Sequence, residues 1–387
     1  MTDLNAAIDA ARGAFAAFAS RCMSGEFTYR LTPSAEPSPY ARCYGVYCHH
    51  LAGVTLTAST RDALASAIRA DVRAYRRQDI DPRAKPFRQL LTFSLSALSA
   101  LGVLAADPLD ELVEEQVPDD VAAELESYGC LSGAPGSGNQ AMFTAIFLLH
   151  ARDHLRKSTG ERLQKWIALH TSRMNRFGFW GSNDALTYLQ FQNGYHQYEI
   201  LEYVGVPAPR RALSGLRSLA DRDGHFAPYP GGGGCYDYDA VFLLTPEGRV
   251  PDSQTRALLE RTAMTLLAEQ RPDGGFAESL HVRPRGTESV RRMVRHIASA
   301  PRDVPVIVER LRYAMALQRP KHNRIHTHWS VYSRRWDESD LWDSWFRMLT
   351  LARIQTALDP AAAATWGFID NPGIGYHTHL RIARVGS

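Results

Sequence analysis

Two kinds of apolar pattern alternate along the chain. In the first, apolar residues recur every three or four positions, as at Leu163, Trp166 and Ile167, which predicts a helix with one buried face. In the second, the run is apolar nearly all round, as in residues 141–149, which predicts a helix buried on all sides. A glycine-rich polar loop separates the first kind from the second. The pattern contains no convincing strand ladder, so we expect an all-α protein.

The loops recur at a nearly fixed spacing over the last two-thirds of the chain. The glycines that mark them lie 45, 46, 51 and 92 residues apart, and 92 is twice 46. They are Gly133, Gly178, Gly224, Gly275 and Gly367. A degenerate member falls at Gln318-Arg319-Pro320, 48 residues after Gln270-Arg271-Pro272. A fixed period indicates stacked supersecondary units, so we expect six helical hairpins that close into an (α/α)6 barrel, or toroid.

This repeat also predicts the domain organisation. We expect residues 1–387 to form one domain, in which residues 128–387 are the repeat units and residues 1–127 add N-terminal helices that complete the outer layer. Apolar periodicity predicts those added helices at about 4–21, 59–77, 85–105 and 109–127. Residues 27–57 carry Pro33, Pro37 and Pro39, which break the helical pattern there.

Composition excludes several classes of partner. A formal net charge of +3 without a long Lys/Arg run argues against nucleic acid. The longest apolar run, residues 90–106, contains four hydroxyl residues and stops short of a membrane span. The five cysteines form no Cys-x-x-Cys pair, and the N-terminus has no signal-peptide pattern. We therefore expect a cytoplasmic protein without a transmembrane segment, and we leave its oligomeric state open.

In a closed barrel, the loops that open the inner helices meet at one mouth, so polar residues there should be neighbours. The free amides of the helix N-termini point at the same mouth. Gly194-Tyr195-His196 and Gly375-Tyr376-His377 even repeat one tripeptide in two units. We predict that His196, Asp237 and His377 line one cavity, with Asp239, as catalytic residues. The predicted substrate-binding residues are Asn139, Gln140, Tyr195, Gln197, Tyr236, Glu278, His326, His328, Trp329, Asp337, Asp340 and Tyr376.

Asp237 and Asp239 are the sharpest local signal. Two carboxylates at i and i+2 that open an apolar helix can differ in pKa, so that one stays protonated at neutral pH and acts as a general acid. The alternative is structural, with Asp237 capping the helix and Asp239 following at its second position. The nearby run Gly231 to Gly234 is not followed by Lys-Ser/Thr, so we expect a flexible connection rather than a phosphate loop.

Two loop sequences resemble a known superfamily. Asp273-Gly274-Gly275-Phe276 after Gln-Arg-Pro, and Gly178-Phe179-Trp180-Gly181 before an inner helix, look like the repeats of the terpenoid cyclases and protein prenyltransferases. The resemblance covers roughly residues 128–385 and implies an (α/α)6 toroid whose cavity opens at the inner-helix starts. Asp237-Tyr238-Asp239 looks like a shortened acid motif of class II terpenoid cyclases, which here lacks its third acidic residue and its threonine.

The same resemblance bears on cofactors. Protein prenyltransferases hold zinc with an Asp, a Cys two positions later and a distant His, whereas here Cys235 precedes Asp237. The His-x-His pairs His326/His328 and His377/His379 could grip a metal only on an extended segment, because i and i+2 diverge on a helix. We therefore assign no metal site. No nucleotide or flavin motif is present, so the cofactor stays unknown, with zinc the one divalent ion considered.

Three functions follow, in order of preference. The first is a terpenoid-cyclase-like cyclase or isomerase that uses acid–base catalysis on a small, largely apolar substrate. The second is a carbohydrate lyase or epimerase, because the histidines, the tyrosines and the pair Arg283/Arg285 suit uronate chemistry. The third is a non-catalytic toroid that binds a peptide or carrier partner. The lining of the cavity distinguishes them, because fold alone does not determine function.

Overall fold

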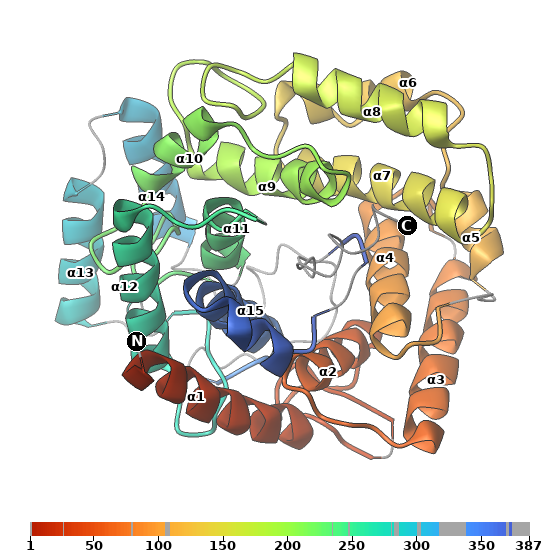
Figure 1. Cartoon of the computed structure of the whole chain (residues 1–387), viewed down its shortest axis with the longest axis horizontal. Helices are drawn as coiled ribbons and strands as arrows, with labels where there is room; N and C mark the ends of the chain where they lie inside the picture. Colours follow the sequence, from red (N-terminus) through yellow and green to blue (C-terminus); the bar gives the residue numbers. More distant parts are fainter. Residues whose placement is uncertain are drawn as a thin grey trace. The chain divides into compact units, whose positions relative to one another are not determined.

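The computed structural model describes residues 2–25, 27–78, 80–104, 109–233, 235–246, 248–279, 281, 286–299, 303–316, 338–368 and 371–373. These residues form helices and loops, with three isolated β-bridges and no strand among them (Figure 1). The prediction of an all-α protein is therefore confirmed. No helix in these ranges is long and apolar enough to cross a membrane.

The chain divides into two compact units. Unit 1 comprises residues 1–56 and 214–367, and unit 2 comprises residues 57–213 and 368–387. Unit 1 holds α1 (Thr2–Arg21), α2 (Pro39–Leu51), α11 (Cys235–Leu244), α12 (Ser253–Glu269), α13 (Thr287–Ala298), α14 (Val304–Ala316), α15 (Leu341–Leu358) and the 3-10 helix η3 (Pro360–Thr365). Unit 2 holds α3 (Ala58–Arg76), α4 (Lys85–Ala100), α5 (Asp110–Glu114), α6 (Val121–Ser127), the 3-10 helix η1 (Cys130–Ser132), α7 (Ser137–Asp153), α8 (Gly160–Ser172) and α9 (Tyr188–Tyr203). The helix α10 (Arg210–Arg217) has residues in both units.

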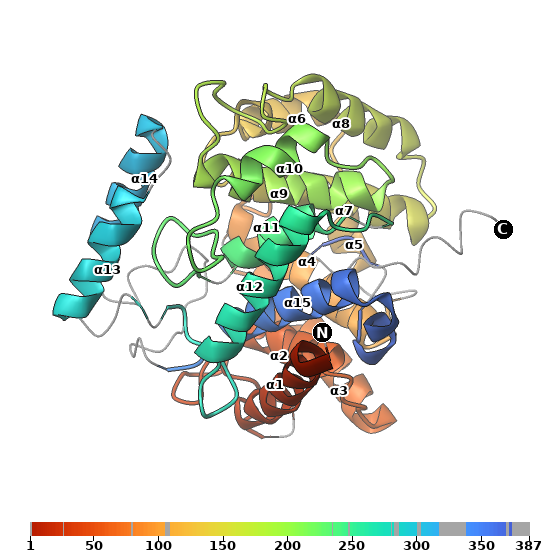
Figure 2. The same ribbon diagram turned by 60° about the vertical axis from the view of Figure 1, so that its left-hand side comes forward.

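Unit 1 is built around α15. This helix is buried along nearly its whole length and packs against α1, α2, α11, α12 and η3 (Figure 1). Its start is fixed by Asp340, whose carboxylate accepts a hydrogen bond from Asp343 N at 2.8 Å. Figure 2 shows α12 and α15 crossing one another within the unit. This crossing brings residues near the end of α12 close to the middle of α15.

Unit 2 is built around α7, which packs against α4, α8 and α9. The contact between α7 and α9 is close because Gly138 has no side chain. A Cβ atom at Gly138 would lie 2.2 Å from Asn193 O. At the start of α9, Thr187 and Gln190 form a capping box, which satisfies amides of its first turn.

The alternation of helices predicted for residues 128–387 is also present in residues 1–127. Six helices are buried along most of their length, namely α2, α4, α7, α9, α11 and α15. The first five follow helices that keep an exposed face, namely α1, α3, α6, α8 and α10, and α15 follows α12 after the two helices α13 and α14. Residues 1–127 thus contain two such pairs. Closure of the six pairs into a toroid, and a single domain, stay predictions.

The N-terminal helices differ in detail from the prediction. The proline-rich segment contains α2, because Pro39 occupies its first turn and Ser38 Oγ accepts a hydrogen bond from Ala41 N at 3.2 Å. Proline is well suited to the first turn of a helix, so the expected break is a helix start. The helix expected at 109–127 is two helices, α5 and α6. Pro118 lies between them, and Asp120 caps α6 by accepting from Ala122 N at 2.9 Å.

Three of the predicted repeat loops share one hydrogen-bonded turn. In the first, Asn175 N donates to Phe179 O at 2.7 Å, and Gly178 N donates to Asn175 O at 2.9 Å. The glycine has φ +84°, a conformation that other residues rarely adopt. The same pair of bonds joins Asp221 with His225 and Gly224, and Arg271 with Gly275 and Gly274. The positive-φ glycines are 46 and 50 residues apart, so the repeat is present in the backbone itself.

The other glycines that were predicted to mark the repeat do not have this position in the turn. In the third turn the positive-φ residue is Gly274, with φ +83°, and the predicted Gly275 is one position late. Gly133 has φ +71° but lies in another kind of turn, and Gly367 N donates to Leu51 O at 3.1 Å. The degenerate member at residues 318–320 lies outside the described residues.

The segment between α12 and α15 is an insertion. Phe276, just after the third turn, forms an isolated bridge with Asp340, at the start of α15. Asp340 N donates to Phe276 O at 3.1 Å. The chain between these two residues contains α13 and α14, which pack against one another (Figure 2). In the third repeat α12 therefore packs against α15, and the described helices α13 and α14 lie between them in the chain.

Candidate functional site

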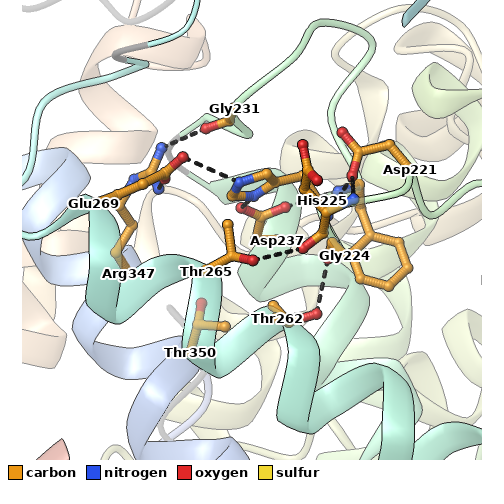
Figure 3. A network of polar contacts seen from close by, with 12 residues as sticks. Asp221, Gly224, His225, Gly231, Asp237, Thr262, Thr265, Glu269, Arg347 and Thr350 are labelled. Carbon is orange, nitrogen blue, oxygen red and sulfur yellow. Dashed lines mark hydrogen bonds and ion pairs between the residues drawn. The ribbon is translucent and has the colours of Figure 1, made fainter. Parts of the chain in front are cut away.

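A buried charged network in unit 1 begins at His225. This residue directly follows Gly224 in the second repeat turn, and its side chain has no exposed surface. His225 Nδ1 lies 2.8 Å from Asp237 Oδ2, and His225 Nε2 lies 3.3 Å from Glu269 Oε1 (Figure 3). Burial alone would lower the pKa of His225, but the two carboxylates outweigh burial and raise this pKa well above its ordinary value. His225 is therefore an imidazolium that donates from both ring nitrogens.

Asp237 joins the turn to α11. It is the third residue of that helix and is 1% exposed. Its Oδ2 accepts from His225, and its Oδ1 accepts from Phe226 N at 2.8 Å. Both of these bonds come from the turn at residues 225–226 and not from α11. Asp237 thus connects two segments and is not the helix cap that the alternative interpretation expected.

Glu269, the last residue of α12, is the centre of the network. Its Oε1 accepts from His225 and, at 2.5 Å, from His281 Nε2. Its Oε2 accepts from Arg347 Nη1 at 2.6 Å. Burial would raise the pKa of Glu269, but the charges of His225 and Arg347 hold it well below its ordinary value. The carboxylate is therefore ionised in the interior of unit 1.

Arg347 completes the charge balance from α15. Its Nη2 donates to Gly231 O at 2.9 Å and to Glu278 O at 2.8 Å. Together, two cations and two carboxylates leave the buried quartet Asp237, His225, Glu269 and Arg347 without net charge. Removing one member would strand an uncompensated buried charge, which typically costs about 3–5 kcal/mol.

Two glycines let the backbone approach this quartet. Gly231 and Gly232 have φ of +87° and +65°. A Cβ at Gly231 would lie 2.4 Å from His281 Cδ2, and a Cβ at Gly232 would lie 2.3 Å from Asp237 Oδ2. Residues 231–233 are all buried. Residues 231–233 thus pack against charged side chains, and the expected flexibility of the connection stays a prediction.

The α12 helix fixes the turn that carries His225. Thr262 Oγ1 donates to Gly224 O at 2.8 Å, and Thr265 Oγ1 donates to Asp223 O at 2.8 Å (Figure 3). Asp221 Oδ1 accepts from the backbone N–H groups of Asp223 and His225, each at 2.9 Å. The turn is thus held by side chains on both sides, and this positions the His225 ring.

The network reaches the surface at His281, whose side chain is 24% exposed. His281 Nδ1 contacts Arg292 Nη1 on α13. A guanidinium group only donates, so Nδ1 is the acceptor and the ring proton lies on Nε2, where it is donated to Glu269. His281 is therefore neutral, and its basic nitrogen faces Arg292. An unbroken series of hydrogen bonds links Asp237, His225, Glu269 and His281.

A group of tyrosines lies beside this surface end. Tyr236 and Tyr313 join their hydroxyl groups at 2.5 Å, and Tyr229 packs its ring at 6.3 and 6.0 Å from theirs. Met293, next to Arg292 on α13, packs against the same group. The α13 helix therefore contacts both the tyrosines and His281. Tyr236 is one of the predicted substrate-binding residues.

In unit 2 the structure joins two other predicted residues that are 57 positions apart. Asn139 Nδ2 lies 3.0 Å from His196 Nε2, and Lys85 Nζ donates to Asn139 Oδ1 at 2.8 Å. Their neighbours have other partners. Gln140 Oε1 accepts from Arg88 at 2.9 Å, Gln197 Nε2 donates to Cys130 O at 3.2 Å, and the Tyr195 ring lies 5.0 Å from that of His196.

The remaining predicted residues have separate positions. Asp239 is fully buried in α11, Asp340 caps α15, and Glu278 contributes its carbonyl group to Arg347. His326, His328, Trp329, Asp337, Tyr376 and His377 lie outside the described residues. His196 and Asp237 belong to different units, so the common cavity with His377 stays a prediction. In the described ranges, no group of three or more His, Cys, Asp or Glu side chains could hold a metal ion.

The sequence interpretation missed His225, Glu269, His281 and Arg347. One signal for His225 was available, because the repeat places it where the first turn has Phe179, and a buried apolar position filled by a histidine needs a charged or polar partner. No family model matches the chain, and no curated protein matches it. The geometry of the two side-chain clusters is therefore the basis for a functional proposal.

Proposed function

We propose that the chain is an acid–base enzyme of the isomerase or lyase class, and that His281 exchanges protons with the substrate. The observation that carries this proposal is the series of hydrogen bonds from buried Asp237 through His225 and Glu269 to the partly exposed His281. Glu269 fixes the orientation and tautomer of His281 and would stabilise the imidazolium that forms when His281 takes a proton. His225 and Asp237 are positioning residues.

The contact with Arg292 suggests the class of substrate. Arg292 donates to the basic nitrogen of His281 and is partly exposed. A substrate carboxylate would pair with this guanidinium and free His281 Nδ1 to take a proton from the adjacent carbon. Tyr236 and Tyr313 are partly exposed, so their rings could stack against a sugar ring, whereas Tyr229 is buried behind them. Both features favour a uronate-type epimerase or lyase, the second of the functions expected from the sequence.

A terpenoid-cyclase-like enzyme in a six-hairpin toroid is the other candidate. Its general acid would have to hold a proton, whereas Asp237 accepts hydrogen bonds from an imidazolium and an amide. The acid of a cyclase would therefore be Asp239, which is fully buried in an otherwise apolar stretch of α11 and so suits an apolar substrate. A non-catalytic toroid that binds a peptide or carrier protein is the third proposal.

The test uses two substrate panels in D2O, uronate-containing oligosaccharides and acyclic isoprenoids, with mass spectrometry of the products. We expect deuterium uptake or a new double bond in the uronate panel. His281→Gln should lower that turnover by about 10²–10⁴-fold, the usual contribution of a general acid or base. The control is His154→Gln, at an exposed position, which should keep full turnover. Turnover of isoprenoids that survives His281→Gln and is lost in Asp239→Asn would instead support the cyclase.

A further inference from the structure

The outward face of α14 in unit 1 is apolar and exposed. Ten large apolar side chains are exposed in the described ranges, and six of them lie on α13 and α14. Four of the six belong to α14, namely Val304, Val308, Leu311 and Met315, which are 68%, 36%, 44% and 67% exposed. Figure 2 shows α13 and α14 at its left-hand edge, beyond α11 and α12. Exposed apolar side chains that gather in this way mark an interaction surface, whereas scattered ones need no explanation.

The spacing makes these four residues of α14 a single stripe. Intervals of four, three and four residues place their side chains within about 60° of one another around a helix with 3.6 residues per turn. An apolar stripe with this spacing is the seam along which two helices pack in a coiled coil. The partner that fits the stripe is therefore another helix.

The opposite face of α14 holds the helix on unit 1. Val306 and Arg310 are buried, and Arg310 donates to His296 O on α13. Tyr313 joins its hydroxyl group to that of Tyr236 on α11 at 2.5 Å. Val306, Arg310 and Tyr313 lie about 180° from the stripe around the helix axis. The stripe therefore faces away from these contacts, on the side that a second molecule can reach.

The two flanks of the stripe differ in character. Glu309 and Arg312 lie on one side, and Ile307 and Ala314 lie on the other. When two α14 helices pair antiparallel about a two-fold axis, each flank meets the same flank of the partner. Arg312 then lies within about 3 Å, along the helix axis, of the level of the partner's Glu309. In a parallel pair, each charged flank would instead face an apolar one.

The intervals of four, three and four residues also read the same in both directions. An antiparallel second copy therefore sets Val304 against the partner's Met315. It likewise sets Val308 against the partner's Leu311, so a smaller side chain meets a larger one at every level. The antiparallel direction also places the positive end of each helix beside the negative end of the other.

We propose that α14 is a dimer interface, which pairs antiparallel with α14 of a second copy of this chain through Val304, Val308, Leu311 and Met315. Residues 303–316 carry two acidic and two basic side chains, and this balance favours a second copy over an acidic protein or an anionic membrane. A pair of 13-residue helices covers less than the roughly 1,600 Å² of a standard interface, so we expect a dimer that dissociates on dilution. The proposal does not depend on the acid–base function.

Sedimentation velocity of the full chain over a range of protein concentrations tests this interface. We expect the monomer mass at low concentration and a mass approaching twice that value at high concentration. Leu311→Glu should raise the dissociation constant at least tenfold, because it places a charge against the partner's Val308. Met264→Glu is the matched control, since Met264 is 66% exposed on α12, and it should leave the dissociation constant unchanged.

Charge variants test the antiparallel pairing. Arg312→Glu makes the charged flank wholly acidic, and Glu309→Arg makes it wholly basic, so each variant should repel its own copy and dimerise more weakly than the wild type. An equimolar mixture of the two variants should form dimers at concentrations where neither variant does so alone, because each charged flank then meets one of opposite sign.

A chain that stays monomeric at every concentration would overturn the proposal, as would a dimer that Leu311→Glu leaves intact or a mixture of the charge variants that does not associate. Leu311→Glu should also leave the urea unfolding midpoint unchanged at concentrations where the wild type is monomeric, because the position is on the surface. A lower midpoint, or a variant that does not fold, would show that the chain itself covers the stripe, and this too would overturn the proposal.

Discussion

At the residue scale, His225 separates two carboxylates that would otherwise face one another inside unit 1. We predict that His225→Phe, which restores the residue type of the first repeat turn, lowers the free energy of unfolding by about 3–5 kcal/mol. The loss arises because Asp237 and Glu269 are left as buried charges with only Arg347 to balance them. Urea denaturation followed by circular dichroism gives this free energy.

The control for this prediction is His154→Phe, at an exposed histidine in unit 2, where a change within about 0.5 kcal/mol is expected. If His225→Phe were as stable as the wild type, the network would not hold the charges assigned to it, and the acid–base proposal would lose its support.

At the element scale, the close approach of α7 and α9 depends on one glycine. We predict that Gly138→Ala destabilises the protein by more than about 2 kcal/mol, because its Cβ would lie 2.2 Å from a backbone oxygen that cannot move without α9. Gly13→Ala is the matched control, since Gly13 lies inside α1 with nothing within 4 Å of the added Cβ. Alanine is the better helix former, so this control should gain about 0.5–1 kcal/mol. Equal effects of the two substitutions on the unfolding midpoint would contradict the packing described for α7.

Elements also show which parts of the structure were readable from the sequence. The glycine spacing located the repeat turns because a positive φ needs glycine at a fixed place in each turn. The third turn was misplaced by one residue because Gly274 and Gly275 are adjacent, and both are sterically required, with a Cβ at Gly275 only 2.6 Å from Ser339 Cβ. The α13–α14 insertion was not foreseen, because its amphipathic pattern is that of any repeat helix.

The candidate site was less predictable for a different reason. Asp237 was found because it opens an apolar helix, a feature of local sequence. Its partners come from a turn, the end of α12 and the middle of α15, and neither His281 nor Arg347 occupies a repeat position at the start of an inner helix. Only tertiary packing brings these residues together, so local pattern carries no signal for them.

At the scale of the whole molecule, buried histidines make stability depend on pH. Burial lowers the pKa of His170 to about 4, burial and Lys85 lower that of His196 to about 3, and burial and Arg310 lower that of His296 to about 3. In the unfolded chain these rings take up protons below about pH 6.5, so the free energy of unfolding falls as the pH falls. The slope approaches about 1.4 kcal/mol per pH unit for each ring.

Burial lowers the pKa of His49 as well, which adds to this loss, whereas His225 and Glu269 act mainly outside this pH window. The pKa of His225 is raised, so its contribution is present below about pH 6.5 and is lost as the pH rises through the folded value. The pKa of Glu269 is lowered, so its contribution is lost only as the pH falls below about 4.5. Urea midpoints at pH 6.5 and 5.5 should therefore show lower stability at pH 5.5, with a smaller loss in His196→Gln. An unchanged or higher midpoint at pH 5.5 would contradict the buried neutral rings.

The central claim is that a charged His225 and a neutral His281 share Glu269, and imidazole ¹⁵N spectroscopy of the labelled full chain at pH 7 tests it without a substrate. The account predicts protons on both nitrogens of His225 and on Nε2 alone of His281, with the two residues assigned from His225→Phe and His281→Gln. A neutral His225 ring, or a proton on Nδ1 of His281, would contradict the account.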